Sequence, residues 1–352
     1  KIFLLFLFFL SPIFSFAQDD LEQIFKAEVV EVGQSYEEHL DFGVETAISI
    51  QDIKVKILEG QNKGEEIELR NEFSELSIGN KIFLKYIQYG ENESEYSLYE
   101  IDRSFGLWFT IAFFIFVILF FSRMKGLRSL LALGGSILSI IYILIPAMMA
   151  GYNPIFVSVL VAGMILFFAL FISHGFNRGS LIAFSGTIIA VIFTGILASV
   201  LISLTKLTGL GTEETVYLNI FFNGDLDFVG LLLGAIIIGM LGALDDVAIT
   251  QVAVIKEFYK FDKTLSLKKT YIKGMRVGRE HVSALVNTLV LAYTAVSLPI
   301  LLLYSQNNES LDLVLSREIF ATEIVRIVAG SIGLVLAVPI TTVLAVYFLK
   351  PK

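Results

Sequence analysis

Seven long apolar stretches follow one another after Arg103. An α-helix rises about 1.5 Å per residue, so about 20 apolar residues cross about 30 Å of hydrocarbon. The pattern therefore predicts a polytopic α-helical membrane domain over residues 105–352. The predicted spans are 105–122, 129–149, 154–173, 180–204, 228–252, 281–304 and 321–349.

Residues 18–104 show a different pattern, in which apolar and polar residues alternate in short runs. Alternation with a period of two is typical of half-buried β-strands. Gly60–Gly64 and Gly79–Asn80 have the composition of turns, because glycine tolerates backbone angles that other residues resist. This segment is predicted to be a small all-β domain, with an OB-like barrel as the first choice. Its predicted strands are 27–32, 47–58, 65–70, 81–89 and 96–101.

Residues 1–17 combine Lys1, an apolar run, Pro12 and the small residues Ser15 and Ala17. This order is typical of a secretory signal peptide. An uncleaved N-terminal anchor is the alternative, because only Pro12 interrupts the apolar run. In both cases the β-domain that follows is expected to be exported.

The composition agrees with a membrane protein and excludes chemistry that depends on cysteine. Hydrophobic residues make up 55% and aromatic residues 13% of the 352 residues, and the mean hydropathy of +0.76 is too high for a soluble protein of this size. The chain has no cysteine, so disulfides, thiolate metal ligands and cysteine nucleophiles are excluded.

Charge is divided unevenly along the chain. Residues 18–104 hold 21 acids and 8 bases, whereas residues 105–352 hold 13 acids and 17 bases. With the β-domain outside, the bases of the connections gather on the inner side, as the positive-inside rule requires. We therefore expect a bacterial plasma membrane protein with residues 18–104 extracytoplasmic and a cytoplasmic C-terminus. The inner connections would hold Arg123, Lys125, Arg128, Arg178, the bases from Lys256 to Arg279, Lys350 and Lys352.

The predicted connection from Lys256 to Arg279 carries eight basic residues. Anionic lipid head groups attract such a cluster by about 1 kcal/mol per base, so lipid contact is the first interpretation and a cytosolic anion or partner is the second. Nucleic acid is not expected as a partner. Aromatic residues for stacking are few on this connection, and the acidic β-domain repels phosphate.

Two adjacent carboxylates, Asp245 and Asp246, lie within the fifth apolar stretch. A lipid-facing aspartate at mid-membrane costs about 2.5 to 3.5 kcal/mol, so acids in spans usually face protein or water. Helical spacing places Asp246 and Thr250 on one stripe with Gly239 and Gly242, which predicts that Asp246 points into the helix bundle. The alternative is that the span ends just before the pair and both acids lie among lipid head groups.

Polar residues on the last two predicted spans complete the candidate set. Asn287 lies at the predicted depth of the aspartates and could either hydrogen-bond to Asp246 or join helices together. Glu323 and Arg326 are three residues apart and can pair on one helix face. They would either neutralise each other at a helix end or line an outer vestibule. His174 is interpreted as an interfacial residue.

No catalytic motif is present. The sequence lacks a His-Glu-x-x-His pattern, a phosphate-binding Gly-x-x-x-x-Gly-Lys-Ser/Thr loop and a Gly-x-Ser-x-Gly elbow. An intramembrane aspartyl protease would need two carboxylates from different helices, whereas the two aspartates here are neighbours in sequence. We therefore expect no enzymatic activity, no cofactor and no metal site.

Two long segments of the chain resemble the YibE/F family of bacterial multi-span membrane proteins. They are Gly242-Ala-Leu-Asp-Asp-Val-Ala-Ile-Thr-Gln251 and Arg276-Val-Gly-Arg-Glu-His-Val-Ser-Ala-Leu-Val-Asn-Thr-Leu-Val-Leu-Ala-Tyr293. The resemblance extends from the β-domain through the seventh span. It implies the same layout and transfers neither a substrate nor a catalytic residue.

Two functional hypotheses follow. The first is a transporter or channel for a small solute or ion, in which Asp245, Asp246, Thr250 and Asn287 form a polar site in the inner half of the membrane. Protonation of the aspartates would allow proton coupling. The alternative is a non-transporting scaffold or sensor whose extracytoplasmic β-domain binds an envelope partner.

Overall fold

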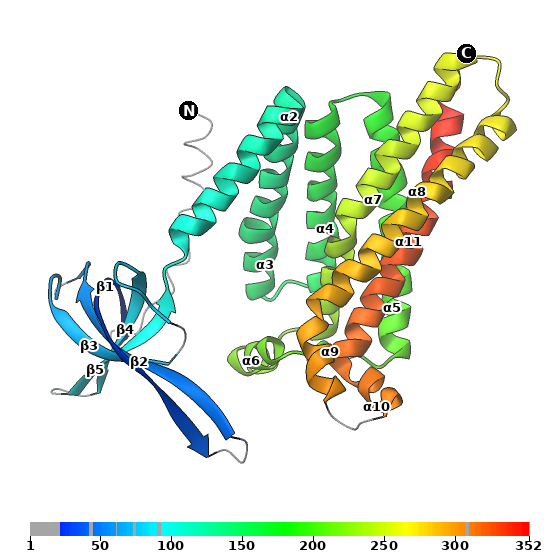
Figure 1. Cartoon of the computed structure of the whole chain (residues 1–352). Coiled ribbons are helices and arrows are strands. Elements are labelled where there is room, and N and C mark those ends of the chain that lie inside the picture. The colour runs from blue at the N-terminus through cyan, green and yellow to red at the C-terminus, as the bar shows by residue number, and fades with distance from the viewer. Residues whose placement is uncertain are drawn as a thin grey trace. The chain divides into compact units, whose positions relative to one another are not determined.

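The computed structural model describes residues 22–41, 45–60, 62–72, 75–89, 93–306 and 310–351. The chain forms two compact units, divided between Val117 and Ile118. The first contains a β-sheet and the second contains helices (Figure 1). The predicted signal peptide or anchor at residues 1–17 lies outside the described residues.

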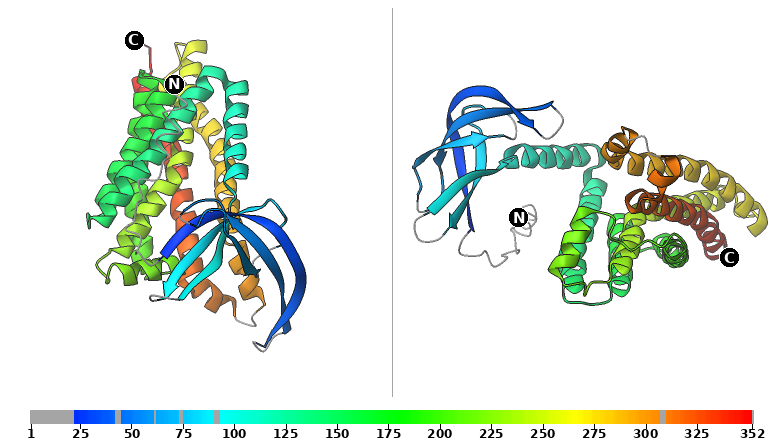
Figure 2. Two further views of the ribbon diagram at one scale, coloured as in Figure 1. Left: turned by 90° about the vertical axis from the view of Figure 1, so that its left-hand side faces the viewer. Right: turned by 90° about the horizontal axis from the view of Figure 1, so that it is seen from below.

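The β-sheet is antiparallel, with the strand order β3-β2-β1-β4-β5. The central strand β1 pairs with both β2 and β4, and the edge strands β3 and β5 contact each other. The sheet is thus curled into a half-barrel, which confirms the predicted OB-like domain (Figure 2). The strands are β1 (Glu22–Asp41), β2 (Glu45–Ile57), β3 (Glu66–Asn71), β4 (Lys81–Tyr89) and β5 (Glu93–Ile101).

Alternation along the strands places one set of apolar side chains inside the curl. Ala27, Val29, Val55, Ile82 and Leu84 are all fully buried in one cluster. The turn between β2 and β3 contains the predicted pair of glycines, which have φ angles of 88° and 93° and so adopt a backbone conformation that favours glycine. The apolar positions that predicted the strands therefore form the core that stabilises the domain.

A buried glutamine fixes the segment that follows β3. Gln51 is 6% exposed; its Oε1 accepts hydrogen bonds from the Leu76 N–H (2.9 Å) and Asn71 Nδ2 (3.1 Å), and its Nε2 donates to the Leu76 carbonyl (3.0 Å). We expect Gln51→Leu to destabilise the β-domain by about 1–3 kcal/mol, because the Leu76 amide groups lose their partner. Faster hydrogen exchange at the Leu76 amide would report the loss. The control Lys56→Met alters an exposed side chain of the same strand and should leave this exchange unchanged.

Helices make up the second unit, and two short π-helical segments, η1 and η2, interrupt them. Helix α2 begins in the first unit and ends in the second. The elements are α2 (Ser104–Ser139), η1 (Ile140–Leu144), α3 (Ile145–Met149), α4 (Pro154–Phe167), η2 (Phe168–Ile172), α5 (Arg178–Leu204), α6 (Glu213–Phe221), α7 (Phe228–Phe261), α8 (Leu267–Val296), α9 (Leu298–Ser305), α10 (Leu311–Ser316) and α11 (Glu318–Phe348).

Among the described residues, five helical segments are long and apolar enough to cross a membrane, or six if the bent pair α8 and α9 counts as one span. The sequence predicted seven. The difference lies in the 46-residue segment Ser104–Met149, which contains the first two predicted spans. That segment is about twice as long as one crossing requires.

The backbone of this segment leaves the helical conformation at Arg123, with φ 48° and ψ −127°. A Cβ added to Gly126 would lie 2.7 Å from the Ile118 carbonyl oxygen, so the chain folds back on Ile118 at the break. The segment thus contains a break between the two predicted spans. Counted as two spans, it brings the total to the predicted seven.

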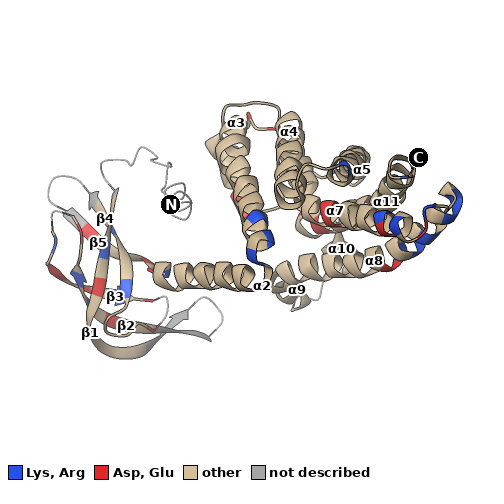
Figure 3. Ribbon diagram, turned by 90° about the horizontal axis from the view of Figure 1, so that it is seen from above, with Lys and Arg blue, Asp and Glu red and all other residues tan. Residues whose placement is uncertain are grey.

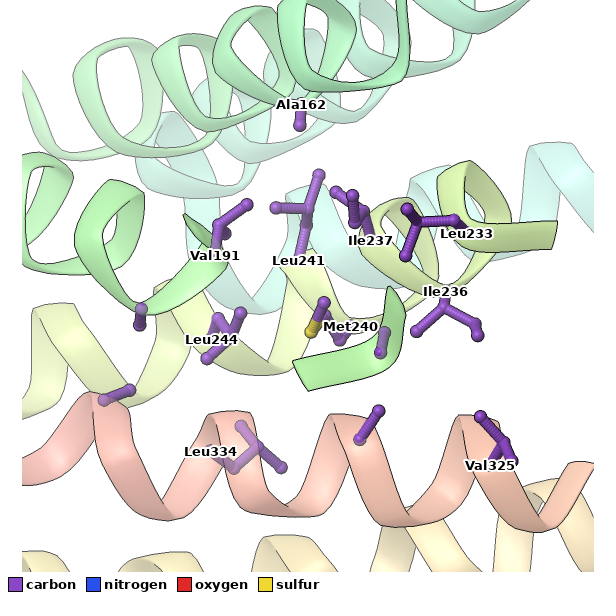
Figure 4. Close-up of a cluster of buried hydrophobic side chains, with 14 of the residues drawn as sticks. Ala162, Val191, Leu233, Ile236, Ile237, Met240, Leu241, Leu244, Val325 and Leu334 are labelled. Carbon is purple, nitrogen blue, oxygen red and sulfur yellow. The ribbon is translucent and has the colours of Figure 1, made fainter. Parts of the chain in front are cut away.

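Helix α7 is the centre of the helical core and contacts α4, α5, α8 and α11. It contributes large buried side chains, including Ile236, Met240 and Leu244, which pack around Val191 of α5 and Leu334 of α11 (Figure 4). Small residues let the helices approach closely elsewhere: Gly234 lies against Ser158, Gly333 against Thr194 and Gly186 against Thr341.

The basic run from Lys256 to Arg279 is mostly helical rather than a connecting loop. Helix α7 continues to Phe261 and α8 begins at Leu267, so only the short segment between them is non-helical. The bases therefore lie on two helix ends, where Figure 3 shows them in blue. Many apolar side chains of the helices are exposed, as expected for helices that contact lipid.

Candidate functional site

A cavity of about 900 Å³ lies within the helical unit beside the two aspartates. Its volume falls within the range of about 300–1,000 Å³ that is common for small-molecule sites. The lining comes from the part of α2 beyond residue 117, from α4 and the segment that includes η2, and from α7. It consists of Ile118, Ser122, Lys125, Gly126, Arg128, Ser129, Ala132, Leu133, Ser136, Ile165, Ala169, Ser173, His174, Gly242, Asp245 and Asp246.

Both aspartates line this cavity from α7, but their relative burial is the reverse of the prediction. Asp245 is half-buried, whereas Asp246 is exposed. The predicted stripe of small residues is exposed along its length, and an added Cβ at Gly242 would meet nothing within 4 Å. The reason is that α7 packs through its large apolar residues, so the small residues remain on the open face. The stripe therefore leaves space beside the aspartates instead of admitting a neighbouring helix.

Basic residues from other elements line the same cavity. Lys125 and Arg128 follow the break in α2 at Arg123, and His174 follows the π-helical segment η2. Figure 3 shows Lys and Arg at the bend of α2 and Asp and Glu on α7. Sequence reasoning missed these two bases as site residues and interpreted His174 as interfacial. The sequence carries no signal for this, because only the folded chain brings these bases and α7 to one cavity.

The acids and bases of this cavity are not paired with one another. Among the residues that the structure describes, no ion pair joins Asp245 or Asp246 to Lys125 or Arg128. The cavity therefore presents carboxylates and cationic groups that remain available to a ligand.

His174 is affected by a negative and a positive charge of the cavity, those of Asp246 and Lys125. Its partial burial lowers its pKa below the ordinary 6.5, with Lys125 acting in the same direction and Asp246 opposing it. Because the unfolded chain then binds a proton more readily, stability is retained above pH 6.5 and declines as the pH falls through the folded-state pKa. We expect His174→Gln to reduce the fall in the unfolding temperature between about pH 7.5 and pH 5.5. An unchanged pH dependence in this variant would contradict this assignment.

Thr250 and Asn287 lie outside the lining of the cavity. Both side chains are exposed, Thr250 one turn beyond Asp246 and Asn287 on α8. The described residues include no hydrogen bond between Asp246 and Asn287. The exposed face of α8 also carries Glu280, Ser283 and Thr294, so its polar stripe, like that of α7, faces away from the helical core.

Glu323 and Arg326 form the predicted pair on α11, with Arg326 Nη1 2.9 Å from Glu323 Oε1. Both side chains are partly buried, and the guanidinium lies over the Tyr293 ring at 5.6 Å from its centroid. The pair also lines a second cavity, of about 210 Å³, together with Ala235 of α7 and Gly209. Helix α7 therefore passes two cavities, one near Ala235 and the other near Asp245 and Asp246.

Gln251 is a buried polar residue that sequence reasoning did not select. Its Nε2 donates hydrogen bonds to the Gly274 carbonyl of α8 (2.8 Å) and to Thr342 Oγ1 of α11 (2.7 Å). Gly274 and Gly278 allow α8 to approach this side chain. Their Gly-x-x-x-Gly spacing was a usable signal, since it is typical of close helix contacts in membranes. The junction holds three helices together five residues beyond Asp246.

In the part of the chain that the structure describes, no group of three or more His, Asp or Glu side chains is placed to hold a metal ion. The cavity thus contains two carboxylates, three nitrogen bases and several hydroxyls without a convergent ligand set.

Comparison with known proteins finds two matching family models. A model described as YibE/F-like protein matches residues 110–351, and one described as YibE/F family N-terminal domain matches residues 20–101. No curated protein and no solved structure matches the chain.

Proposed function

The chain belongs to the YibE/F family, and from the geometry of its cavities we propose that its helical unit moves a small solute or ion across the bacterial plasma membrane. The observation that supports this function best is that Asp245 and Asp246 line a cavity of about 900 Å³ from the open face of a membrane helix. Carboxylates in a span are costly in lipid, and a water-filled cavity removes that cost.

The open face of α7 offers a path between the two cavities. Ala235 lines the smaller cavity, Gly242 and Asp246 line the larger one, and the exposed Gly239 lies between them. An added Cβ at Gly239 would lie 3.0 Å from the Tyr293 hydroxyl, so Tyr293 of α8 contacts α7 at this midpoint. We assign to Tyr293 the barrier that closes the path in this conformation.

The distribution of bases supports the direction of the path. With the positive end of the helical unit inside, the larger cavity opens toward the cytoplasm and the smaller cavity opens toward the extracytoplasmic side. The pair Glu323 and Arg326 then lines an outer vestibule. Uptake and release of a proton by the aspartates would accompany movement of the solute.

Thiol labelling combined with transport tests this function, since the chain has no background cysteine. Ser136→Cys lies in the lining of the larger cavity, whereas Val200→Cys lies on an exposed apolar face of α5. A water-soluble methanethiosulfonate reagent should modify the first position and leave the second, which faces lipid, unmodified. Modification at Ser136→Cys should also block transport. Transport is measured in proteoliposomes that contain a pH dye and are supplied in turn with inorganic ions and amino acids.

Two results would contradict the transport function. One is a Ser136→Cys thiol that the reagent cannot reach. The other is a lumenal pH and solute content that equal those of empty liposomes for every ion and amino acid supplied. The second result would favour the alternative, in which the helical unit anchors a β-domain that binds an envelope partner.

A further inference from the structure

The larger cavity carries opposite charges on its two walls. Asp245 and Asp246 come from α7, and Lys125 and Arg128 come from α2. None of the ion pairs among the described residues joins these acids to these bases. The cavity thus keeps two separate charged regions.

The size and lining of the cavity favour a molecule over a bare ion. A volume of about 900 Å³ exceeds what a single ion requires, and Ala132, Leu133 and Ile165 add apolar surface to the lining. A tight cation site would need convergent oxygen ligands, and the described side chains do not provide three acidic or histidine groups at one point.

We propose that this cavity binds a small zwitterionic solute, with its ammonium group on Asp245 and Asp246 and its anionic group on Lys125 and Arg128. Such a ligand satisfies both walls at once and keeps the net charge of the filled site unchanged. A purely cationic or purely anionic solute would leave one pair of charged side chains without a partner. This inference rests on the proposed transport function and names its substrate class.

A zwitterionic group of this kind occurs in two sources, a free amino acid and the phosphoethanolamine head group of a lipid. Both present an ammonium and an anionic group a few bonds apart. The binding experiment therefore contains one arm for each source.

In the first arm, the purified chain in detergent is tested for binding of the common amino acids, using labelled forms. The best ligand is then compared with its methyl ester, which is only cationic, and its N-acetyl form, which is only anionic. The zwitterion should bind about tenfold or more tightly than either, the loss expected when one charge-assisted interaction is missing. In the second arm, nanodiscs that contain phosphatidylethanolamine and nanodiscs of phosphatidylglycerol are each added as competitors. The displacement of the same labelled ligand from the chain is then compared between the two lipids.

Variants distinguish recognition from misfolding. Lys125→Met combined with Arg128→Met should weaken the zwitterion about tenfold and leave the methyl ester unaffected. Asp245→Asn combined with Asp246→Asn should weaken the zwitterion and leave the N-acetyl form unaffected. A misfolded chain would lose all three ligands. The control Lys263→Met removes an exposed base outside the cavity and should change none of them.

Preference for a zwitterion in the first arm supports a free solute, and competition by phosphatidylethanolamine alone supports the lipid source of the same chemistry. Equal binding of the singly charged forms, or no binding in either arm, overturns the inference. If the aspartate variants abolish transport of an ion while no zwitterion binds, the inference fails and the transport function stands. If neither transport nor binding occurs, both fail.

Discussion

Proteoliposomes that contain the Asp246→Asn chain are expected to retain less than about one-tenth of the wild-type solute-dependent change in lumenal pH. The side chain of Asp246 lines the larger cavity and is exposed, so a ligand that follows the proposed path along α7 meets this carboxylate directly. The amide keeps the size of the side chain and removes both its negative charge and its ability to exchange a proton. A lost charge-assisted contact of about 1.5–3 kcal/mol corresponds to a tenfold or larger effect.

Three companion variants sharpen this test. Asp246→Glu keeps the charge and should retain measurable transport, and Asp245→Asn should also impair transport, because Asp245 lines the same cavity. Asp225→Asn makes the same chemical change at an exposed carboxylate outside both cavities and should behave like the wild type. Wild-type transport by the Asp246→Asn chain would remove this carboxylate from the mechanism.

Gly278→Val is expected to lower the unfolding temperature of the purified chain by about 5 °C or more. A Cβ at this position would collide with Val338 of α11 and would lie 3.0 Å from Gln251 Oε1. The valine must therefore displace α8 from α7 and α11, and it disturbs the hydrogen bonds that Gln251 makes to Gly274 and Thr342. Overpacking of this kind costs about 1–3 kcal/mol before the lost hydrogen bonds are included.

A glycine in open surroundings provides the matched control. An added Cβ at Gly163 of α4 would meet nothing within 4 Å, so Gly163→Ala should leave stability unchanged or raise it slightly through better helix propensity. Thermal unfolding followed by size-exclusion chromatography compares the two variants. Equal stability of the Gly278→Val chain and the wild type would mean that α8 is not held at this junction.

The architecture was predictable because local periodicity determines it. Alternation in residues 18–104 predicted the strands. The observed ends of β3 and β4 differ from their predicted ends by a few residues at most. The apolar stretches predicted the membrane helices, and composition alone identified a membrane protein. The long β1, from Glu22 to Asp41, exceeded its prediction, because pairing with β2 extends it through residues whose own pattern is polar.

The candidate site was predictable only in part. Asp245 and Asp246 were recognisable because a carboxylate in an apolar stretch carries a free-energy cost that sequence reveals. Lys125, Arg128 and His174 could not be joined to them, because these residues are more than 70 positions away and meet α7 only through the break at Arg123 and the packing of η2. The open face of α7 was also missed, since small residues occur both at helix contacts and at cavities. Only the positions of the neighbouring helices distinguish the two cases.

Two buried hydroxyls in the helical core have a practical consequence for handling this protein. Ser158 Oγ and Thr341 Oγ1 are fully buried and have no hydrogen-bond partner among the described residues. Each lies against a glycine, Gly234 and Gly186 respectively, and neither belongs to a cavity wall described above. Ser158→Ala and Thr341→Val would remove a dehydrated hydroxyl and preserve the local volume. These two positions are therefore where a more durable preparation for biochemistry can be engineered without altering the chemistry of the proposed transport path.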